Sequence, residues 1–135
     1  KRSHNFHWDK SSVVIERNHI NHCGMCLPCI YRRVALGTIG LDNADILGTD
    51  INNGITYDLE NLKQVRARDY RSLLHFLKRR MTESTIRKEL KANHITCELG
   101  LDDYVRLVMH SYEQVISWVS RKGNLTAKTI AGIRL

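Results

Sequence analysis

Residues 101–123 read LDDYVRLVMHSYEQVISWVSRKG, and this stretch decides the fold class of the chain. Its apolar side chains recur every three or four residues, which places them on one face of a helix. The stripe consists of Leu101, Tyr104, Val105, Val108, Tyr112, Val115, Ile116 and Val119. Asp102 and Asp103 favour a helix N-terminus, and Gly123 is a suitable C-terminal stop. The stretch therefore predicts one long amphipathic helix.

The same spacing predicts shorter helices on both sides of this stretch. Residues 59–80 form one amphipathic segment with Asp58 as its N-cap, and a second helix is expected over 83–91 with Thr82 as its cap. A last short helix is expected over 126–134. The expected fold class is therefore mainly α, a small helical bundle.

The composition suits one domain with a hydrophobic core, because 42% of the 135 residues are hydrophobic. The single proline, Pro28, leaves room for long helices. No apolar run approaches the ~20 residues that cross a membrane, and the first residues lack the apolar segment of a signal peptide. We therefore expect no membrane partner and a reducing, cytoplasmic location.

The positive charge is concentrated in one part of the chain. Between Lys63 and Lys91 lie ten basic and three acidic residues, a surplus that equals the whole net charge of +7. A focused basic surface attracts phosphate groups, so nucleic acid is a possible partner of this stretch. The alternative is an ordinary solvated helix face, and few aromatic residues are available there for base stacking.

Three cysteines form the clearest chemical motif, in the run HCGMCLPC at residues 22–29. Cys23, Cys26 and Cys29 repeat a Cys-x-x-Cys spacing, which lets several thiolates face one zinc ion. Gly24 suits the bend of such a knuckle. An iron–sulfur cluster is the other metal hypothesis, although Arg33 stands where ferredoxin-type runs have a further cysteine. Three unligated cysteines are the alternative without a metal.

The fourth ligand of this site stays open at the sequence level. His19 lies four residues before Cys23 and is the main candidate, whereas His22 is adjacent to Cys23, which makes joint ligation awkward. Cys97 is the remaining thiol, but a distant cysteine is more often a small buried hydrophobic residue.

The run from His22 to Leu36, HCGMCLPCIYRRVAL, resembles the C-terminal zinc motif of the QueC-like family of 7-cyano-7-deazaguanine synthases and their relatives. The family pattern is approximately Cys-Gly-x-Cys-x-x-Cys-x-x-Arg. The matching residues are Cys23, Gly24, Cys26, Cys29 and Arg32. The Pro-Cys-Ile-x-Arg-Arg ending is more similar to the phage-defence branch of the Qat type than to the queuosine-pathway enzymes.

The resemblance implies the C-terminal part of an α/β ATP-pyrophosphatase of the PP-loop class. Such enzymes activate a carboxylate with ATP and convert 7-carboxy-7-deazaguanine toward amide and nitrile, while defence relatives are thought to modify a partner protein. It also implies structural zinc near the substrate pocket, with Arg32 or Arg33 as candidate contacts to substrate or ATP phosphates. We predict no catalytic residue in this chain.

Two departures from the family pattern matter. The Ser-Gly-Gly-x-Asp-Ser phosphate loop is absent from these residues, so ATP would be bound by an N-terminal PP-loop domain, and the chain would be the C-terminal segment. The family's upstream cysteine ligand is also missing, because Ser12 stands near its expected position. Serine is a poor zinc ligand at neutral pH, which leaves His19 or a three-thiolate site.

These patterns divide the chain into three parts. Residues 1–22 are expected to form a polar arm with a possible short strand, residues 23–36 a zinc knuckle with a short helix, and residues 37–135 a helical domain after a loop. The helical bundle should pack on the cysteine-rich loop. The alternative function is a zinc-containing module that binds nucleic acid or a protein.

Overall fold

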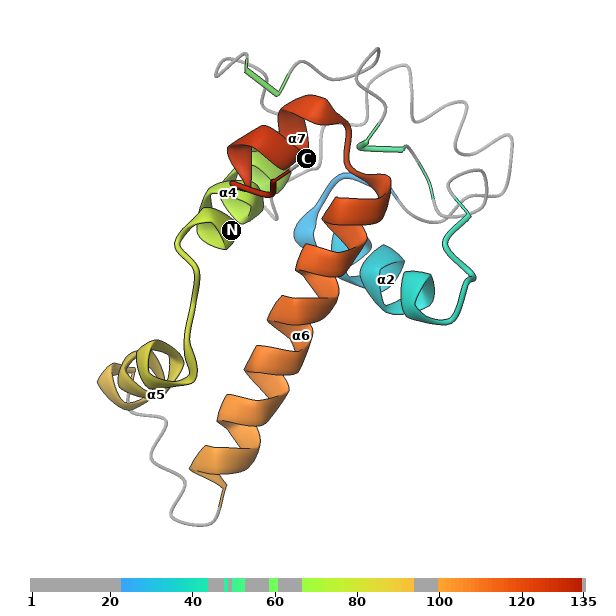
Figure 1. Cartoon of the computed structure of the whole chain (residues 1–135). Helices are drawn as coiled ribbons and strands as arrows, with labels where there is room; N and C mark the ends of the chain where they lie inside the picture. The colour runs from blue at the N-terminus through green and yellow to red at the C-terminus, as the bar shows by residue number, and fades with distance from the viewer. Residues whose placement is uncertain are drawn as a thin grey trace, which may run out of the picture.

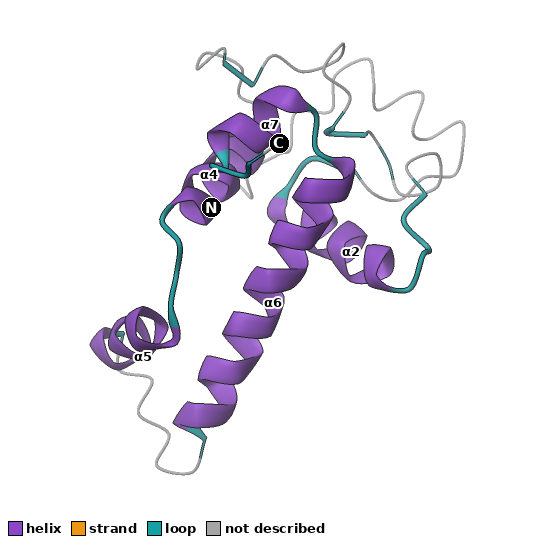
Figure 2. Cartoon of the chain, viewed as in Figure 1, coloured by secondary structure: helices purple, strands orange, loops and turns teal. Residues whose placement is uncertain are grey.

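The computed structural model describes residues 23–43, 48, 50–52, 59–60, 67–93 and 100–134. The described part of the chain is mainly helical and contains no strand (Figure 2), as the sequence predicts for the fold class. Its helices are α2 (Leu27–Thr38), α4 (Arg68–Lys78), α5 (Glu83–Ala92), α6 (Leu101–Lys122) and α7 (Leu125–Ile130). None of these helices is long and apolar enough to cross a membrane. The expected arm at 1–22 lies outside the described residues.

Helix α6 is the scaffold on which the other helices are arranged (Figure 1). Helices α2 and α7 pack near its C-terminal half, α4 packs on α2 and α7, and α5 packs on α6 at the opposite end. The main core lies where α2, α4, α6 and α7 meet. Its centre includes Ile30, Tyr70, Leu74 and Trp118, all with no exposed surface. Tyr70 and Trp118 meet edge to face with ring centroids 6.2 Å apart.

The buried face of α6 differs in part from the predicted stripe. Val105, Tyr112, Val115 and Val119 are buried as predicted, but Tyr104 is 43% exposed. Trp118, which lies outside the stripe, is completely buried because α2 covers that side of the helix. Among the described helices, α5 is the one that packs on the N-terminal half of α6, and these described elements leave part of the predicted apolar face uncovered there.

The predicted helix boundaries are correct where a local cap determines them. Helix α5 begins after Thr82, whose Oγ1 accepts a hydrogen bond of 3.2 Å from the Thr85 backbone N–H. The expected helix over 59–80 is wrong at its start, because Leu59 and Glu60 lie in a turn and α4 begins only at Arg68. Leu59 contributes a buried side chain from this turn, so its apolar character reflects core packing and not helical periodicity. The proposed cap Asp58 lies outside the described residues.

Gly123 ends α6 for a reason other than left-handed backbone geometry. Its φ and ψ are −62° and 139°, an extended conformation open to any residue. A Cβ at this position would lie 2.5 Å from the carbonyl oxygen of Val119, so only glycine permits the close approach. The chain then enters α7 through Asn124, whose Oδ1 accepts a hydrogen bond of 2.8 Å from the Ala127 N–H.

One side chain of α6 connects the end of α4 to the segment that leads into α5. The Tyr112 hydroxyl donates to the Leu77 carbonyl oxygen at 2.9 Å and accepts from the Met81 N–H at 3.2 Å. Its ring also meets Phe76 edge to face, with centroids 5.9 Å apart. Tyr112 therefore satisfies two backbone groups at the point where α4 ends.

Replacing Tyr112 by phenylalanine should lower the free energy of unfolding by about 1–2 kcal/mol, because it leaves the Met81 N–H without its partner and removes one of the bonds to the Leu77 carbonyl, which still accepts from the Arg80 N–H at 3.2 Å. Tyr104→Phe is the matched control, since Tyr104 is on the same helix but exposed, and should change stability by less than about 0.5 kcal/mol. Urea unfolding of both variants measures the difference. Equal effects would contradict the role assigned to Tyr112.

Candidate metal centre

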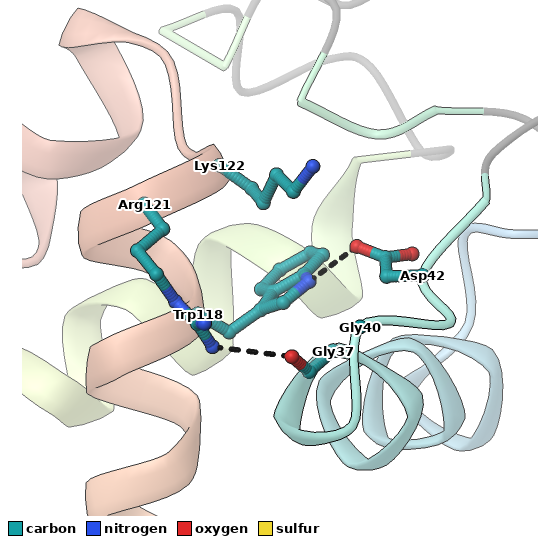
Figure 3. Close-up of a pocket in the computed structure, with 6 residues that line it drawn as sticks. All are labelled: Gly37, Gly40, Asp42, Trp118, Arg121 and Lys122. Carbon is teal, nitrogen blue, oxygen red and sulfur yellow. Dashed lines mark hydrogen bonds between the residues drawn. The ribbon is translucent and has the colours of Figure 1, made fainter.

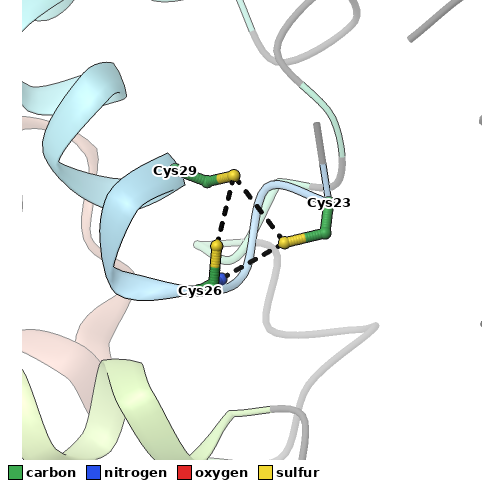
Figure 4. A group of neighbouring side chains, drawn as sticks. All are labelled: Cys23, Cys26 and Cys29. Carbon is green, nitrogen blue, oxygen red and sulfur yellow. Dashed lines mark hydrogen bonds between the residues drawn. The ribbon is translucent and has the colours of Figure 1, made fainter. Parts of the chain in front are cut away.

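The sulfur atoms of Cys23, Cys26 and Cys29 lie together at the start of α2 (Figure 4). The Cys26 and Cys29 Sγ atoms are 3.4 Å apart, and those of Cys23 and Cys29 are 3.7 Å apart. All three lie within 4.8 Å of one another, and each side chain is partly buried. The structure thus confirms that the three cysteines lie close enough to share one metal ion.

The backbone between Cys23 and Cys26 turns its amides toward sulfur. The N–H groups of Met25 and Cys26 both point to the Cys23 Sγ, at 3.5 and 3.4 Å. The chain reaches this geometry through Gly24, whose φ of +75° lies in the region that glycine adopts readily. Amide donors stabilise negative charge on sulfur, so the local fold favours a thiolate at Cys23.

Helix α2 positions the other two sulfurs. Cys26 is its N-cap residue, Pro28 is accommodated in the first turn, and Cys29 follows within that turn. The helix N-terminus carries partial positive charge, which favours thiolates nearby. The Leu27 N–H donates to Asp69 Oδ2 at 3.3 Å, and this bond fastens the start of α2 to the first turn of α4.

The local environment shifts the pKa values of Cys23 and Cys26 in opposite directions. Burial raises the pKa of Cys23, but hydrogen bonds from the Met25 and Cys26 amides and from the neighbouring thiols outweigh burial, so the pKa falls below its ordinary value. Burial, together with the proximity of the other cysteines, raises the pKa of Cys26 to about 12. One thiolate therefore forms readily, whereas a full set of thiolates needs a compensating positive charge such as a metal ion.

The donor set and the spacing fit a thiophilic divalent ion. Tetrahedral zinc with Zn–S bonds of about 2.3 Å places its sulfur ligands about 3.8 Å apart. The observed separations of 3.4 and 3.7 Å are close to this value, and they are far longer than the roughly 2.05 Å of a disulfide bond. Within the described ranges, these cysteines are the only such ligand group. The candidate fourth ligand His19, like His22 and Cys97, lies outside the described residues.

The two arginines predicted to contact phosphate groups occupy different environments. Arg32 is exposed on α2, three residues after Cys29, so both side chains lie on the same side of the helix. Arg33 is only 2% exposed and faces the core. Its Nε lies 2.7 Å from Asp42 Oδ1, and its Nη1 lies 2.8 Å from Asp50 Oδ1. Because Arg33 is buried, Arg32 is the more accessible of the two candidate arginines.

Arg33 belongs to a polar network inside the core. Its guanidinium stands over the Trp118 ring at 5.3 Å, and the Trp118 Nε1–H donates to Asp42 Oδ2 at 2.7 Å. Burial raises the pKa of Asp42, but the hydrogen bonds from Arg33 and Trp118 outweigh it and hold that pKa below its ordinary value. The network continues through Asp50, which accepts the Asn52 N–H at 3.1 Å. Sequence spacing does not indicate this network, because its members are dispersed over α2, α6 and the segment that follows α2.

A small pocket opens beside this network (Figure 3), lined by Gly37, Gly40, Asp42, Trp118, Arg121 and Lys122. Its volume of about 240 Å³ is below the range of about 300–1,000 Å³ typical of small-molecule sites. Arg121 reaches across it and donates to the Gly37 carbonyl oxygen at 3.5 Å. The pocket is therefore a gap between the ends of α2 and α6 and does not offer room for a nucleotide.

No family model matches the chain, and neither a curated protein nor a solved structure shows significant similarity. The cysteine cluster is therefore the feature on which a functional proposal has to rest.

Removing the buried guanidinium should be costly. Arg33→Gln leaves Asp42 buried without its cation and should lower the free energy of unfolding by about 3 kcal/mol or more. Arg32→Gln removes the neighbouring, exposed guanidinium and should cost less than about 1 kcal/mol. Denaturant unfolding of the two variants gives the comparison. A stable Arg33→Gln protein would show that the network does not hold the core.

Proposed function

We propose that this chain is the zinc-bearing C-terminal segment of a QueC-like, ATP-dependent enzyme that acts on a 7-deazapurine-type carboxylate. The observation that supports it is the cluster of Cys23, Cys26 and Cys29, with two amides directed at Cys23 Sγ. These residues are the same ones that match the family motif. The exposed Arg32 adds to this support, since it matches the motif and shares the Cys29 side of α2.

In this proposal the three cysteines hold the zinc, and His19 is the candidate for the remaining position. The bound ion supplies a structural cross-link between the knuckle and the first turn of α2. The hydrogen bond from the Leu27 N–H to Asp69 connects the cross-linked knuckle to α4. Arg32 then stands at the rim of the ordered site, where a guanidinium can pair with a substrate carboxylate or an ATP phosphate.

The chemistry proposed for the complete enzyme is carboxylate activation by ATP, followed by conversion toward amide and nitrile. ATP would bind to an N-terminal PP-loop domain of the same protein, and this chain would contribute the zinc site and Arg32. In the defence branch the acceptor would be a partner protein, which could approach the helical bundle. No residue of this chain is assigned a covalent step.

Zinc analysis of the purified chain tests the metal part of the proposal. We expect one zinc per chain, and Cys26→Ser should abolish tight binding and lower the melting temperature by roughly 10 °C, because metal binding contributes folding free energy. Cys97→Ser is the control, as it removes the cysteine outside the motif, and should leave the zinc content unchanged.

Cobalt substitution extends this test to the fourth ligand. If His19 is a ligand, His19→Ala should shift the visible absorption of the cobalt-loaded chain, whereas His22→Ala should not. A chain without zinc whose three motif cysteines all react freely with a thiol reagent would contradict the metal site itself.

The enzymatic part is tested on the full-length protein, including whatever precedes Lys1. We expect AMP to form from ATP only when 7-carboxy-7-deazaguanine and ammonia are supplied. Arg32→Gln should raise KM for one of these substrates while lowering the free energy of unfolding by less than about 1 kcal/mol. ATP use that does not depend on any deazapurine, or the lack of a PP-loop in the full protein, would refute this part. Either result would leave the zinc measurement unaffected.

A further inference from the structure

The structure brings together basic residues that are far apart in the sequence. Lys78, Arg79 and Arg80 lie at the C-terminal end of α4, which packs beside α7 (Figure 1). The Arg80 guanidinium donates to the Gly132 carbonyl oxygen at 2.6 Å. A Cβ on Gly132 would lie 3.4 Å from the Lys78 Cγ, so the turn after α7 is in contact with the end of α4. Arg134 is two residues further along this turn.

We call the group of Lys78, Arg79, Arg80 and Arg134 the basic corner. All four side chains are exposed. Among the described residues, the ion pair of this group is Arg79 with Glu89, at 3.8 Å, and both of its side chains are more than half exposed. Such a pair contributes little and is easily exchanged for another anion. The corner therefore keeps a surplus of positive charge.

One cation of the corner, Arg80, is held in place by a hydrogen bond. Arg80 has a φ of +54°, which is uncommon for a residue with a side chain, and its hydrogen bond to Gly132 stabilises that conformation. The carbonyl end of α4 offsets only about half a charge. Like charges gathered on one surface repel one another unless an anion approaches, so the arrangement favours binding of a polyanion.

The surroundings indicate which polyanion fits. The large exposed hydrophobic residues of the described chain all lie elsewhere: Tyr31, Ile39, Leu41, Tyr104, Leu107 and Leu125. A protein interface usually has an apolar centre, and a membrane surface takes up apolar side chains. The four residues of the basic corner are all cationic, and the neighbouring Met81 and Ile133 are only partly exposed. A surface of this kind suits the phosphates of a nucleic-acid backbone, which carry charge without an apolar surface.

We propose that the basic corner binds the phosphate backbone of nucleic acid without reading its sequence. This binding does not depend on the metal centre or on the proposed enzymatic activity. Four cations in contact with phosphates give a slope of about −3 to −4 in a plot of log K against log salt concentration, and affinity in the micromolar range near physiological salt.

Fluorescence anisotropy with a labelled duplex of about 20 base pairs, titrated with the full chain at several salt concentrations, tests the proposal. Arg79→Gln/Arg134→Gln removes two cations from different elements and should weaken binding at least ~10-fold at low salt and reduce the slope by about two. The matched control is Lys88→Gln/Lys91→Gln, which removes two exposed cations of α5 outside the corner. It should weaken binding less than ~3-fold and leave the slope nearly unchanged.

Circular dichroism melting should be the same for both double variants, which separates binding from folding. Equal losses in the two variants would show that binding depends on net charge alone and would overturn the proposal. A slope near zero would do the same. If polyglutamate displaces the duplex as effectively as unlabelled DNA at equal charge concentration, the corner is a site for acidic proteins instead.

Discussion

The buried guanidinium of Arg33 is the interaction on which the rest of the structure depends. A cation in the core must be paired, because an unpaired charge there would lose its hydration without compensation. Asp42 and Asp50 provide the pairing, and Trp118 provides an aromatic face and a hydrogen bond to Asp42. These contacts join α2 to α6 and to the segment that follows α2 in the chain. The orientation of α2 is fixed as a result, and α2 carries the cysteines at its start.

Local sequence signals predicted the features that local geometry determines. The Cys-x-x-Cys spacing predicted the sulfur cluster because its turn closes within a few residues, and Thr82 predicted the start of α5 because a cap acts on the next turn. The roles of Trp118 and Arg33 in the buried polar network were not predicted from the sequence. The partners of Arg33 lie 9 and 17 residues away across a loop, and no periodicity reports such contacts. The predicted start of α4 at residue 59 was wrong for a similar reason. Leu59 lies in a turn and is buried by tertiary packing, which its apolar character alone does not distinguish from a place in a helix.

Helix α4 relates the two candidate binding regions to each other. At its first turn Asp69 holds the Leu27 N–H beside the cysteines, and at its other end Lys78 and Arg80 contact the turn after α7. Its apolar face, with Tyr70, fills the core between them. A single rigid element thus sets the position of a thiolate site and of a cationic surface. The two regions offer opposite chemistry, since one presents thiols that suit a metal cation and the other presents cations that suit an anion, and they do not share side chains.

The N-terminal half of α6 extends beyond the main core, where α5 is its one neighbour among the described helices. Ile86 and Val105 are buried there but do not belong to the main cluster, and Tyr112 marks the boundary between the two regions. The described residues make few apolar contacts at this end, so its free energy of opening should be below that of global unfolding. The molecule would then contain two cooperative units, with amide hydrogens of α5 exchanging through partial opening while those of the C-terminal half of α6 exchange only when the whole protein unfolds.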